Sequence, residues 1–195
     1  MGYGVSWIEL VGTVFGLISV VLAARAHILT WGAGIVNECC LFLLFYQVQL
    51  YPDMFLQVFF FGVTVYGWVQ WNKPEQERAI AWLTPRWRLI LGGALISATA
   101  LSWWFFSRIH VLLPMWFSEP TAFPLADSFV MVASVTATAL LAMKKMETWW
   151  VWMGVDVVCI FLYLSRGVYF LSLEYLIFLG LASYGLFNWM RKRQG

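Results

Sequence analysis

Seven long runs of apolar residues, separated by short polar or proline-containing segments, form the main pattern of the sequence. A helix that crosses a membrane needs about 20 largely apolar residues, and each run is close to that length. The runs cover residues 5–24, 29–48, 54–71, 87–107, 127–143, 149–165 and 171–190. The pattern therefore predicts an all-α integral membrane protein with seven transmembrane helices.

The segments between the runs contain residues that interrupt a helix or favour water. Tyr51, Pro52 and Asp53 follow the second run, and the charged stretch 73–78 follows the third. Pro114, Pro120 and Pro124 follow the fourth run. Because proline lacks a backbone donor and disfavours helix in the residue before it, the segment after the fourth run is predicted to be a long loop.

The composition supports a membrane protein and excludes several other classes. Of the 195 residues, 62% are hydrophobic and only 11% are charged, whereas an ordinary soluble domain has about 45–50% apolar and about 25% charged residues. This composition does not fit a soluble core of this size, a disordered chain, a nucleic-acid-binding protein or a secreted disulfide scaffold. Cys39, Cys40 and Cys159 lie inside apolar runs without metal-ligand spacing, so we expect free thiols and no metal or cofactor.

The distribution of Lys and Arg predicts the orientation in the membrane. If the amino terminus lies outside, the cytoplasmic segments contain ten of the twelve basic residues. These ten are Arg25, Lys73, Arg78, Arg86, Arg88, Lys144, Lys145, Arg191, Lys192 and Arg193. Only Arg108 and Arg166 then face outward. Because cytoplasmic segments of membrane proteins are enriched in Lys and Arg, we predict an external amino terminus and a cytoplasmic carboxyl terminus.

The chain also matches itself at an offset of 118 residues. The matched pairs are Glu9 and Asp127, Trp31 and Trp149, Glu38 and Asp156, Tyr51 and Tyr169, Gly62 and Gly180, Tyr66 and Tyr184, Gly67 and Gly185, Gln70 and Asn188, and Trp71 and Trp189. Such matches are informative because chance matches in so apolar a chain would mainly involve Leu and Ala. The offset relates the first three runs to the last three.

This internal repeat predicts a 3+1+3 architecture. Residues 1–72 form a first three-helix bundle, and residues 126–195 form a second bundle with a basic cytoplasmic tail. Residues 73–125 contain a cytoplasmic loop, a linker helix and an outer loop. The single linker helix makes the two copies parallel, so a pseudo-twofold axis runs along the membrane normal. Parallel repeats of this kind occur in transporters, with the binding site near the midplane at the repeat interface.

Two acidic residues, Glu38 and Asp156, lie at matching positions inside predicted spans. A charged side chain inside a membrane is costly and usually faces the bundle interior or a cavity. Helical spacing places Trp149, Trp152 and Tyr163 on the same face as Asp156. The two acids are the strongest candidate binding residues. The alternative is that each forms a structural hydrogen bond between helices or is a protonated carboxyl group.

The third helix of each predicted bundle offers an aromatic side chain and an amide one turn apart. The pairs are Tyr66 with Gln70 and Tyr184 with Asn188. Aromatic rings and carboxylates together suit a planar cationic heterocycle, and amides and tyrosine hydroxyls suit ribose hydroxyls or ring substituents. The alternative for the Tyr-Gly pairs at 66–67 and 184–185 is close packing between helices.

Motifs of other function classes are absent from the sequence. It contains no G-x-x-x-x-G-K-[ST], no H-E-x-x-H and no recognisable Ser/His/Asp set, so neither an enzyme nor ATP-driven transport is predicted. The last run has no lysine that would bind retinal. A seven-helix receptor that binds a ligand without transporting it is the alternative from a different class.

Six stretches of the sequence, considered together, resemble the PnuC family of vitamin transporters. They are SWIE at 6–9, QVQLY at 47–51, LQVFFF at 56–61, YGWVQW at 66–71, DVV at 156–158 and GVYFLSLEY at 167–175. The similarity extends over nearly the whole chain. It implies a full-length SWEET-like fold, usually a homotrimer, in the bacterial inner membrane. It also implies facilitated diffusion of a vitamin, nicotinamide riboside in the type member, with trapping by a cytoplasmic kinase and without an ion gradient or ATP.

The resemblance also implies candidate substrate contacts in this chain. They are Asn37, Gln70, Trp149, Trp152, Asp156, Tyr184 and Asn188. Glu38 departs from the family pattern, because an apolar residue is commoner there in nicotinamide riboside carriers. An added acid would equally suit the thiazolium ring of thiamine, which is therefore the alternative substrate. The expected partners are the vitamin, the lipid bilayer and the kinase, and no nucleic acid is expected.

Overall fold

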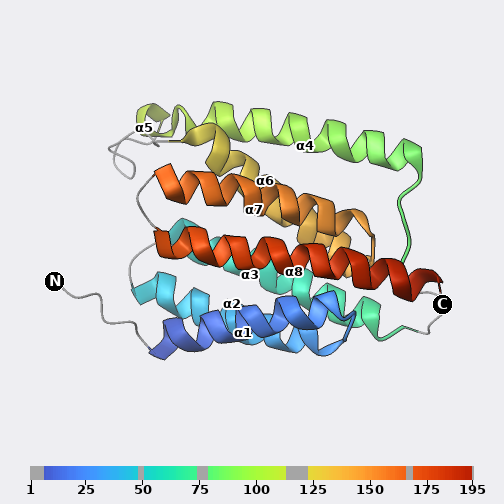
Figure 1. Ribbon diagram of the computed structural model, residues 1–195. Helices are drawn as coiled ribbons and strands as arrows, with labels where there is room; N and C mark the ends of the chain where they lie inside the picture. Colours follow the sequence, from blue (N-terminus) through green and yellow to red (C-terminus); the bar gives the residue numbers. More distant parts are fainter. Residues whose placement is uncertain (1–6, 48–50, 74–78, 113–122, 166–168, 195) are drawn as a thin grey trace.

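The described residues fold into one bundle of long helices (Figure 1). The computed structural model describes residues 7–47, 51–73, 79–112, 123–165 and 169–194. Within these ranges the helices are α1 (Trp7–Ala24), α2 (Leu29–Gln47), α3 (Tyr51–Trp71), α4 (Pro85–Phe106), α5 (Ile109–Leu112), α6 (Pro124–Ala142), α7 (Glu147–Ser165) and α8 (Tyr169–Gln194). By length and composition, α1, α4, α6 and α7 are each apolar enough to cross a membrane. The prediction of an all-α chain with several apolar spanning helices is confirmed.

Two features differ from the predicted runs. α3 begins at Tyr51, so residues 51–53 belong to a helix rather than to a break. Proline is tolerated in the first turn of a helix because its missing N–H would have no intrahelical acceptor there. The short α5 lies in the segment predicted as a loop, where the N–H groups of Val111 and Leu112 both donate to the carbonyl oxygen of Arg108. Pro114 and Pro120 lie outside the described residues.

Six of the long helices form a closed ring, and α4 lies outside it. In each half the middle helix packs against the other two, with α2 between α1 and α3 and with α7 between α6 and α8. The two halves meet where α1 packs against α8 and where α3 packs against α6. α4 packs against α6 from the outer side (Figure 1). Of the residues of α4, all of which are described, only Thr99 is buried.

The segment before α4 is attached to the start of α7. The backbone N–H of Leu83 donates to both carboxylate oxygens of Glu147, at 3.1 Å each. Arg88 Nε forms a salt bridge with Glu147 Oε1 at 2.7 Å. In the same segment, the carbonyl oxygen of Ala81 accepts from the N–H of Met146 at 3.0 Å. The segment that precedes α4 is therefore joined to the start of α7.

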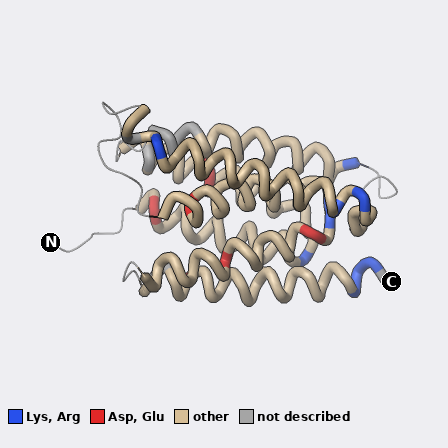
Figure 2. The backbone as a smooth tube through the Cα atoms, turned by 90° about the horizontal axis from the view of Figure 1, so that it is seen from above, with Lys and Arg blue, Asp and Glu red and all other residues tan. Residues whose placement is uncertain are grey.

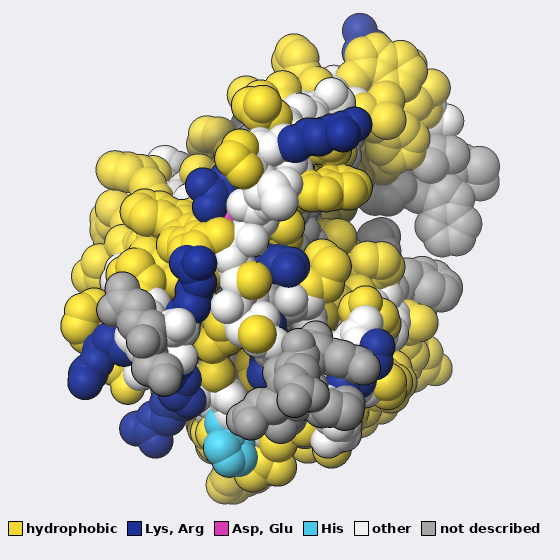
Figure 3. Space-filling model, turned by 90° about the vertical axis from the view of Figure 1, so that its right-hand side faces the viewer, with side chains coloured by type: hydrophobic (Ala, Val, Ile, Leu, Met, Phe, Trp, Pro, Cys, Tyr) yellow, Lys and Arg dark blue, Asp and Glu magenta, His cyan; other side chains and the backbone are white. Residues whose placement is uncertain are grey.

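Lys and Arg residues gather at the end of the bundle where α8 ends (Figure 2). Figure 3 looks onto this end and shows Lys and Arg side chains spread across it. The last turn of α8 carries three basic residues, and one of them, Lys192, donates to the carbonyl oxygen of Arg25 in the turn after α1. Arg108 instead precedes α5, which lies at the opposite end (Figure 1). Arg78 and Arg166 lie outside the described residues.

Hydrogen bonds recur in the two halves at the offset of 118 residues seen in the sequence. The Thr30 hydroxyl at the start of α2 donates to the carbonyl oxygen of Ser19 on α1 at 2.8 Å. The Thr148 hydroxyl at the start of α7 donates to the carbonyl oxygen of Ala137 on α6 at the same distance of 2.8 Å. Both members of each bond shift by the same number of residues, so α1–α2 and α6–α7 are packed in the same way at this point.

Two tryptophans pack against helices at positions occupied by glycine. The Trp31 ring lies so close to Gly67 that a Cβ there would be 2.4 Å from a ring atom. The Trp149 ring lies similarly close to Gly185, where a Cβ would be 2.6 Å away. Real Cβ atoms do not approach other atoms this closely, so both positions require glycine. For these two glycines, the close-packing interpretation of the Tyr-Gly pairs is confirmed.

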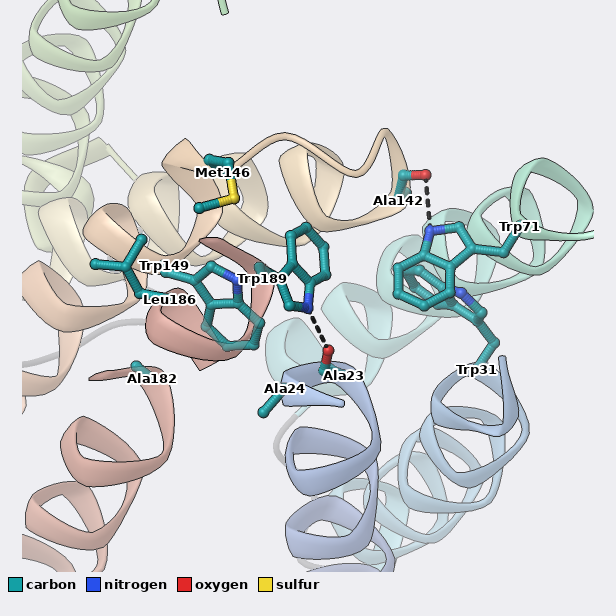
Figure 4. Close-up of a cluster of buried hydrophobic side chains, with 10 residues drawn as sticks. All are labelled: Ala23, Ala24, Trp31, Trp71, Ala142, Met146, Trp149, Ala182, Leu186 and Trp189. Carbon is teal, nitrogen blue, oxygen red and sulfur yellow. Dashed lines mark hydrogen bonds between the residues drawn. The ribbon is translucent and has the colours of Figure 1, made fainter. Parts of the chain in front are cut away.

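Four tryptophans, Trp31, Trp71, Trp149 and Trp189, form a continuous group across the two halves (Figure 4), which we call the tryptophan cluster. Trp31 and Trp71 meet edge to face with ring centroids 5.4 Å apart, and Trp149 and Trp189 do the same at 5.4 Å. The rings of Trp71 and Trp189 join the two pairs at 6.0 Å. Aromatic pairs of this kind contribute about 0.5–1.5 kcal/mol each beyond the area that they bury. The cluster therefore stabilises each half and the contact between the halves.

We predict that Gly67→Ala and Gly185→Ala each lower the melting temperature of the detergent-solubilised protein by several degrees. The added methyl group overlaps a buried tryptophan ring, and overpacking of this kind costs about 1–3 kcal/mol. Intrinsic tryptophan fluorescence during heating measures the change.

Gly62→Ala and Gly180→Ala are matched controls in the same two helices. A Cβ at either position meets no atom within 4 Å, so both variants should melt close to the wild-type temperature. Equal melting temperatures for all four variants would show that the tryptophan packing does not depend on glycine.

Candidate functional site

A cavity of about 460 Å³ lies inside the ring of six helices. Side chains from α1, α2, α3, α6, α7 and α8 line it, so both halves of the chain contribute. Trp31 and Trp149 of the tryptophan cluster are among the lining residues. A cavity of this size suits a small-molecule ligand.

Five of the ten predicted binding residues line this cavity. They are Asn37, Glu38, Trp149, Trp152 and Asp156. All five lie on α2 or α7, the middle helices of the two halves. Asn37 Nδ2 also donates to the carbonyl oxygen of Gly12 on α1 at 2.8 Å, which fixes the orientation of its amide. The acids that match in the sequence therefore border one shared space.

The four predicted residues on α3 and α8 are not part of the lining. Tyr66 and Tyr184 are each 46% exposed. Gln70 donates to the hydroxyl oxygen of Tyr66 on its own helix. Asn188 Nδ2 donates to the carbonyl oxygen of Ala24 at 2.8 Å, so it joins α8 to α1. In this conformation these side chains connect and cover helices rather than border the cavity.

Glu38 is held by a hydrogen bond from a neighbouring helix. Thr64 Oγ1 on α3 donates to Glu38 Oε1 at 2.5 Å. Both side chains are buried, with 9% of Glu38 and 3% of Thr64 exposed. The second carboxyl oxygen of Glu38, Oε2, is buried and has no hydrogen-bond partner among the described residues. It is therefore an available acceptor at the cavity.

Asp156 is also buried, but among the described residues no hydrogen bond like that from Thr64 to Glu38 holds it. It is 3% exposed, and the residue that matches Thr64 in the second half is Ala182, which has no hydroxyl group. Glu174 on α8 adds a third carboxyl group to the lining. Within the part of the chain that the structure describes, none of these three acids has a basic side chain at salt-bridge distance. A buried negative charge is costly without a positive partner.

Aromatic rings make up much of the remaining lining. Trp31 and Trp149 have indole N–H groups that are buried without a hydrogen-bond partner among the described residues. Tyr175 lines the cavity and stacks on Tyr163, with ring centroids 5.5 Å apart and planes at 15°. The predicted residue Tyr163 thus supports a lining side chain and is not itself part of the lining. Trp152 completes a set of flat surfaces on which a planar ligand can stack.

Several polar lining residues were not predicted from the sequence, among them Gln57, Thr64, Glu174 and Tyr175. Gln57 and Thr64 lie seven residues apart, and this spacing places them on one face of a helix. Glu174 is an acid inside a predicted span, which is itself a signal of a functional position. Glu174 is not found by comparing residues 118 positions apart, because the matching residue in the first half is Leu56, which is apolar.

Hydrogen bonds join the two halves at the tryptophan cluster (Figure 4). Trp71 Nε1 on α3 donates to the carbonyl oxygen of Ala142, the last residue of α6, at 3.1 Å. Trp189 Nε1 on α8 donates to the carbonyl oxygen of Ala23, near the end of α1, at 2.9 Å. We call these two bonds the indole latch. The latch crosses both contacts between the halves, so it opposes their separation there.

Comparison with known proteins shows similarity over almost the whole chain. The family model described as "Nicotinamide mononucleotide transporter" matches residues 6–191. The nicotinamide riboside transporter PnuC of Escherichia coli is 33% identical over 208 residues, which cover 97% of this chain and 87% of the relative. The riboflavin/roseoflavin transporter RibM of Streptomyces davaonensis is 28% identical over 190 residues, which cover 96% of this chain and 87% of the relative.

A solved structure has the same fold. The crystal structure of the vitamin B3 transporter PnuC matches with a TM-score of 0.70 at 23% sequence identity, over 97% of this chain and 83% of the other. The resemblance to PnuC transporters in short stretches of the sequence is thus confirmed by the family model, by relatives and by the fold. The chain belongs to the nicotinamide mononucleotide transporter family, the PnuC family of membrane vitamin transporters.

Proposed function

We propose that the protein is a passive membrane carrier that takes up a small, flat, cationic vitamin, and that nicotinamide riboside is its substrate. The observation that carries this proposal is the pair of buried acids, Glu38 and Asp156, which border one aromatic cavity without a basic partner among the described residues. A cation bound near them would offset the cost of removing their charges from water.

The chemistry of nicotinamide riboside matches the cavity. Its flat pyridinium ring carries the positive charge, and its ribose and carboxamide offer hydrogen-bonding groups. Trp149 and Trp152 would stack on the ring through cation–π contact, and Asn37 would bind a hydroxyl or the amide. Glu38 and Asp156 would balance the charge. The name of the Escherichia coli relative, a nicotinamide riboside transporter, supports the same substrate.

Thiamine and riboflavin are the alternative substrates. Thiamine also contains a flat cationic ring, so it would satisfy the two acids in the same way. Riboflavin is suggested by the relative RibM, a riboflavin/roseoflavin transporter. Its ring system is uncharged and would leave Glu38 and Asp156 without a counter-charge, so the cavity favours it least.

Transport would proceed by alternating access between two halves of a 3+1+3 parallel repeat, arranged as in a full-length SWEET-like fold. The hydrogen bonds and tryptophan pairs that recur at the offset of 118 residues support the repeat. The halves would rock about the central cavity, and the indole latch would break when the cavity opens at the basic end. The first half would supply Glu38 and the second half Asp156, so the ligand would contact both halves throughout the movement.

The cellular setting follows from the same proposal. The basic end of the bundle would face the cytoplasm of a bacterium, which places the amino terminus outside the inner membrane. A cytoplasmic kinase would phosphorylate the vitamin after entry and thereby trap it, since the phosphorylated product is too strongly charged for the acidic cavity. No ATP or ion gradient would then be needed at the transporter itself. The assembly would be a homotrimer.

We predict that the purified protein catalyses counterflow of nicotinamide riboside in liposomes, and that Glu38→Gln and Asp156→Asn each weaken substrate binding. Removing one member of a close, desolvated charge pair costs about 2 kcal/mol or more, so each variant should raise the dissociation constant by at least about tenfold. Counterflow of radiolabelled substrate measures transport, and isothermal titration calorimetry measures affinity.

Glu9→Gln is the matched control, because it neutralises an acid in the first turn of α1 outside the cavity lining. It should keep the wild-type affinity. Unchanged affinity in both cavity variants would contradict the charge-based part of the proposal. Counterflow of thiamine alone would reassign the substrate, and tight binding without any counterflow would identify a receptor instead of a carrier.

A second prediction concerns the indole latch. Trp71→Phe and Trp189→Phe keep an aromatic ring but remove the N–H donor, so the basic end of the cavity should open more often. A single reporter, Ser134→Cys in the cavity lining, is introduced after the three native cysteines are replaced by alanine. A membrane-impermeant maleimide applied to inside-out vesicles should label the reporter several-fold faster in both latch variants.

Trp87→Phe is the matched control, because this tryptophan is 59% exposed at the start of α4 and outside the tryptophan cluster. Its labelling rate should equal that of the parent. If the latch variants also label at the parental rate, the latch does not control access from this side.

A further inference from the structure

The two halves of the cavity differ at several matched positions, and two of these differences bear on the carboxyl group of Glu38. Thr64 donates a hydrogen bond to Glu38, whereas the matching residue beside Asp156 is Ala182. Gly34 lines the cavity in the first half, and the matching residue in the second half is Trp152. The first half therefore offers an oriented carboxyl group and open space, and the second half offers a large flat ring.

One carboxyl oxygen of Glu38 is left without a hydrogen-bond partner in the described residues. Thr64 occupies Oε1, and Oε2 is buried without a hydrogen-bond partner among the described residues. A buried acceptor that lacks a partner costs about 1–3 kcal/mol, and more if it is charged. A ligand that supplies a donor or a positive charge at Oε2 removes this cost.

We infer that Glu38 is a specificity-determining residue that binds the charged end of the substrate, and that Thr64 is the positioning residue that aims it. This inference rests on the proposed function, because it takes the substrate to be a flat cation. A cavity with twofold-related halves would accept an unsymmetrical vitamin in two orientations. The Glu38–Thr64 pair on one side and Trp152 on the other select one orientation.

Gly34 is part of the same arrangement. A Cβ at this position would lie 3.4 Å from Thr64 Cγ2 and 3.6 Å from the hydroxyl oxygen of Ser19. A larger side chain there would press on Thr64 and displace the hydroxyl that holds Glu38. The absence of a side chain thus keeps both the space and the hydrogen bond intact.

The competing explanation is that the Thr64–Glu38 hydrogen bond only braces α2 against α3. In that case its loss would lower stability and leave ligand selectivity unchanged. If Thr64 instead positions Glu38, its loss should weaken binding of the charged ligand and change ligand selectivity. The reason is that an unrestrained Glu38 keeps its charge but no longer holds Oε2 in one place.

The test measures binding of nicotinamide riboside and of its reduced, uncharged dihydropyridine form by calorimetry. Wild-type protein should prefer the charged form. Thr64→Val should weaken binding of the charged form by about tenfold, the effect of one hydrogen bond to a charged group, and Thr64→Ser should restore it. In the Glu38→Gln background, in which Asp156 remains and the preference for the charged form should be smaller than in the wild type, Thr64→Val should have no additional effect.

Thr99→Val is the matched control. Thr99 is a buried threonine on α4, outside the cavity lining, and its hydroxyl has no hydrogen-bond partner among the described residues. Its replacement should leave both affinities at the wild-type values. Melting temperatures are recorded for every variant, and Thr64→Ala replaces Thr64→Val if the valine variant does not fold.

The outcomes separate this inference from the proposed function. If the wild-type protein binds neither nicotinamide riboside nor thiamine, the proposed substrate class is wrong. If it binds nicotinamide riboside but Thr64→Val lowers only the melting temperature, the bond is a structural brace and the inference alone is overturned. Multiplicative losses in the double variant would also overturn it, because Thr64 would then act independently of Glu38.

Discussion

The packing of Trp31 on Gly67 and of Trp149 on Gly185 is the constraint on which the rest of the structure depends. A single methyl group at either glycine would overlap a buried ring, so these two contacts set how closely the third helix of each half approaches the second. The rings also determine where Trp71 and Trp189 lie, and those two residues join the halves through their own contact. The hydrogen bonds of Trp71 and Trp189 between the two halves depend on this arrangement.

The cavity combines aromatic side chains with carboxyl groups that have no basic partner among the described residues. Six aromatic side chains line it, yet Glu38, Asp156 and Glu174 bring three carboxyl groups to it without a basic partner among the described residues. A membrane protein retains buried acids of this kind mainly where they serve an ion, a proton or a substrate. In the proposed function, a flat organic cation would stack its ring on the aromatic side chains while its charge compensates the acids.

The sequence predicts the features that the two halves share, and it predicts poorly the features in which they differ. Apolar runs locate the long helices, and the repeat brings Glu38 and Asp156 to one cavity. Tyr66 and Tyr184 repeat just as clearly but are exposed, because matching residues show that two positions are equivalent without showing which way they face. The bond from Thr64 to Glu38 joins side chains 26 residues apart on different helices, and only packing determines such a contact.

The most direct measurement is the structure of the protein with nicotinamide riboside bound. We predict that the pyridinium ring lies inside the cavity against Trp152, with a ligand atom within hydrogen-bond distance of Glu38 Oε2 and with its charge between Glu38 and Asp156. A ligand bound elsewhere on the molecule, or bound in the cavity with its charge remote from both acids, would contradict the central role assigned to these two residues.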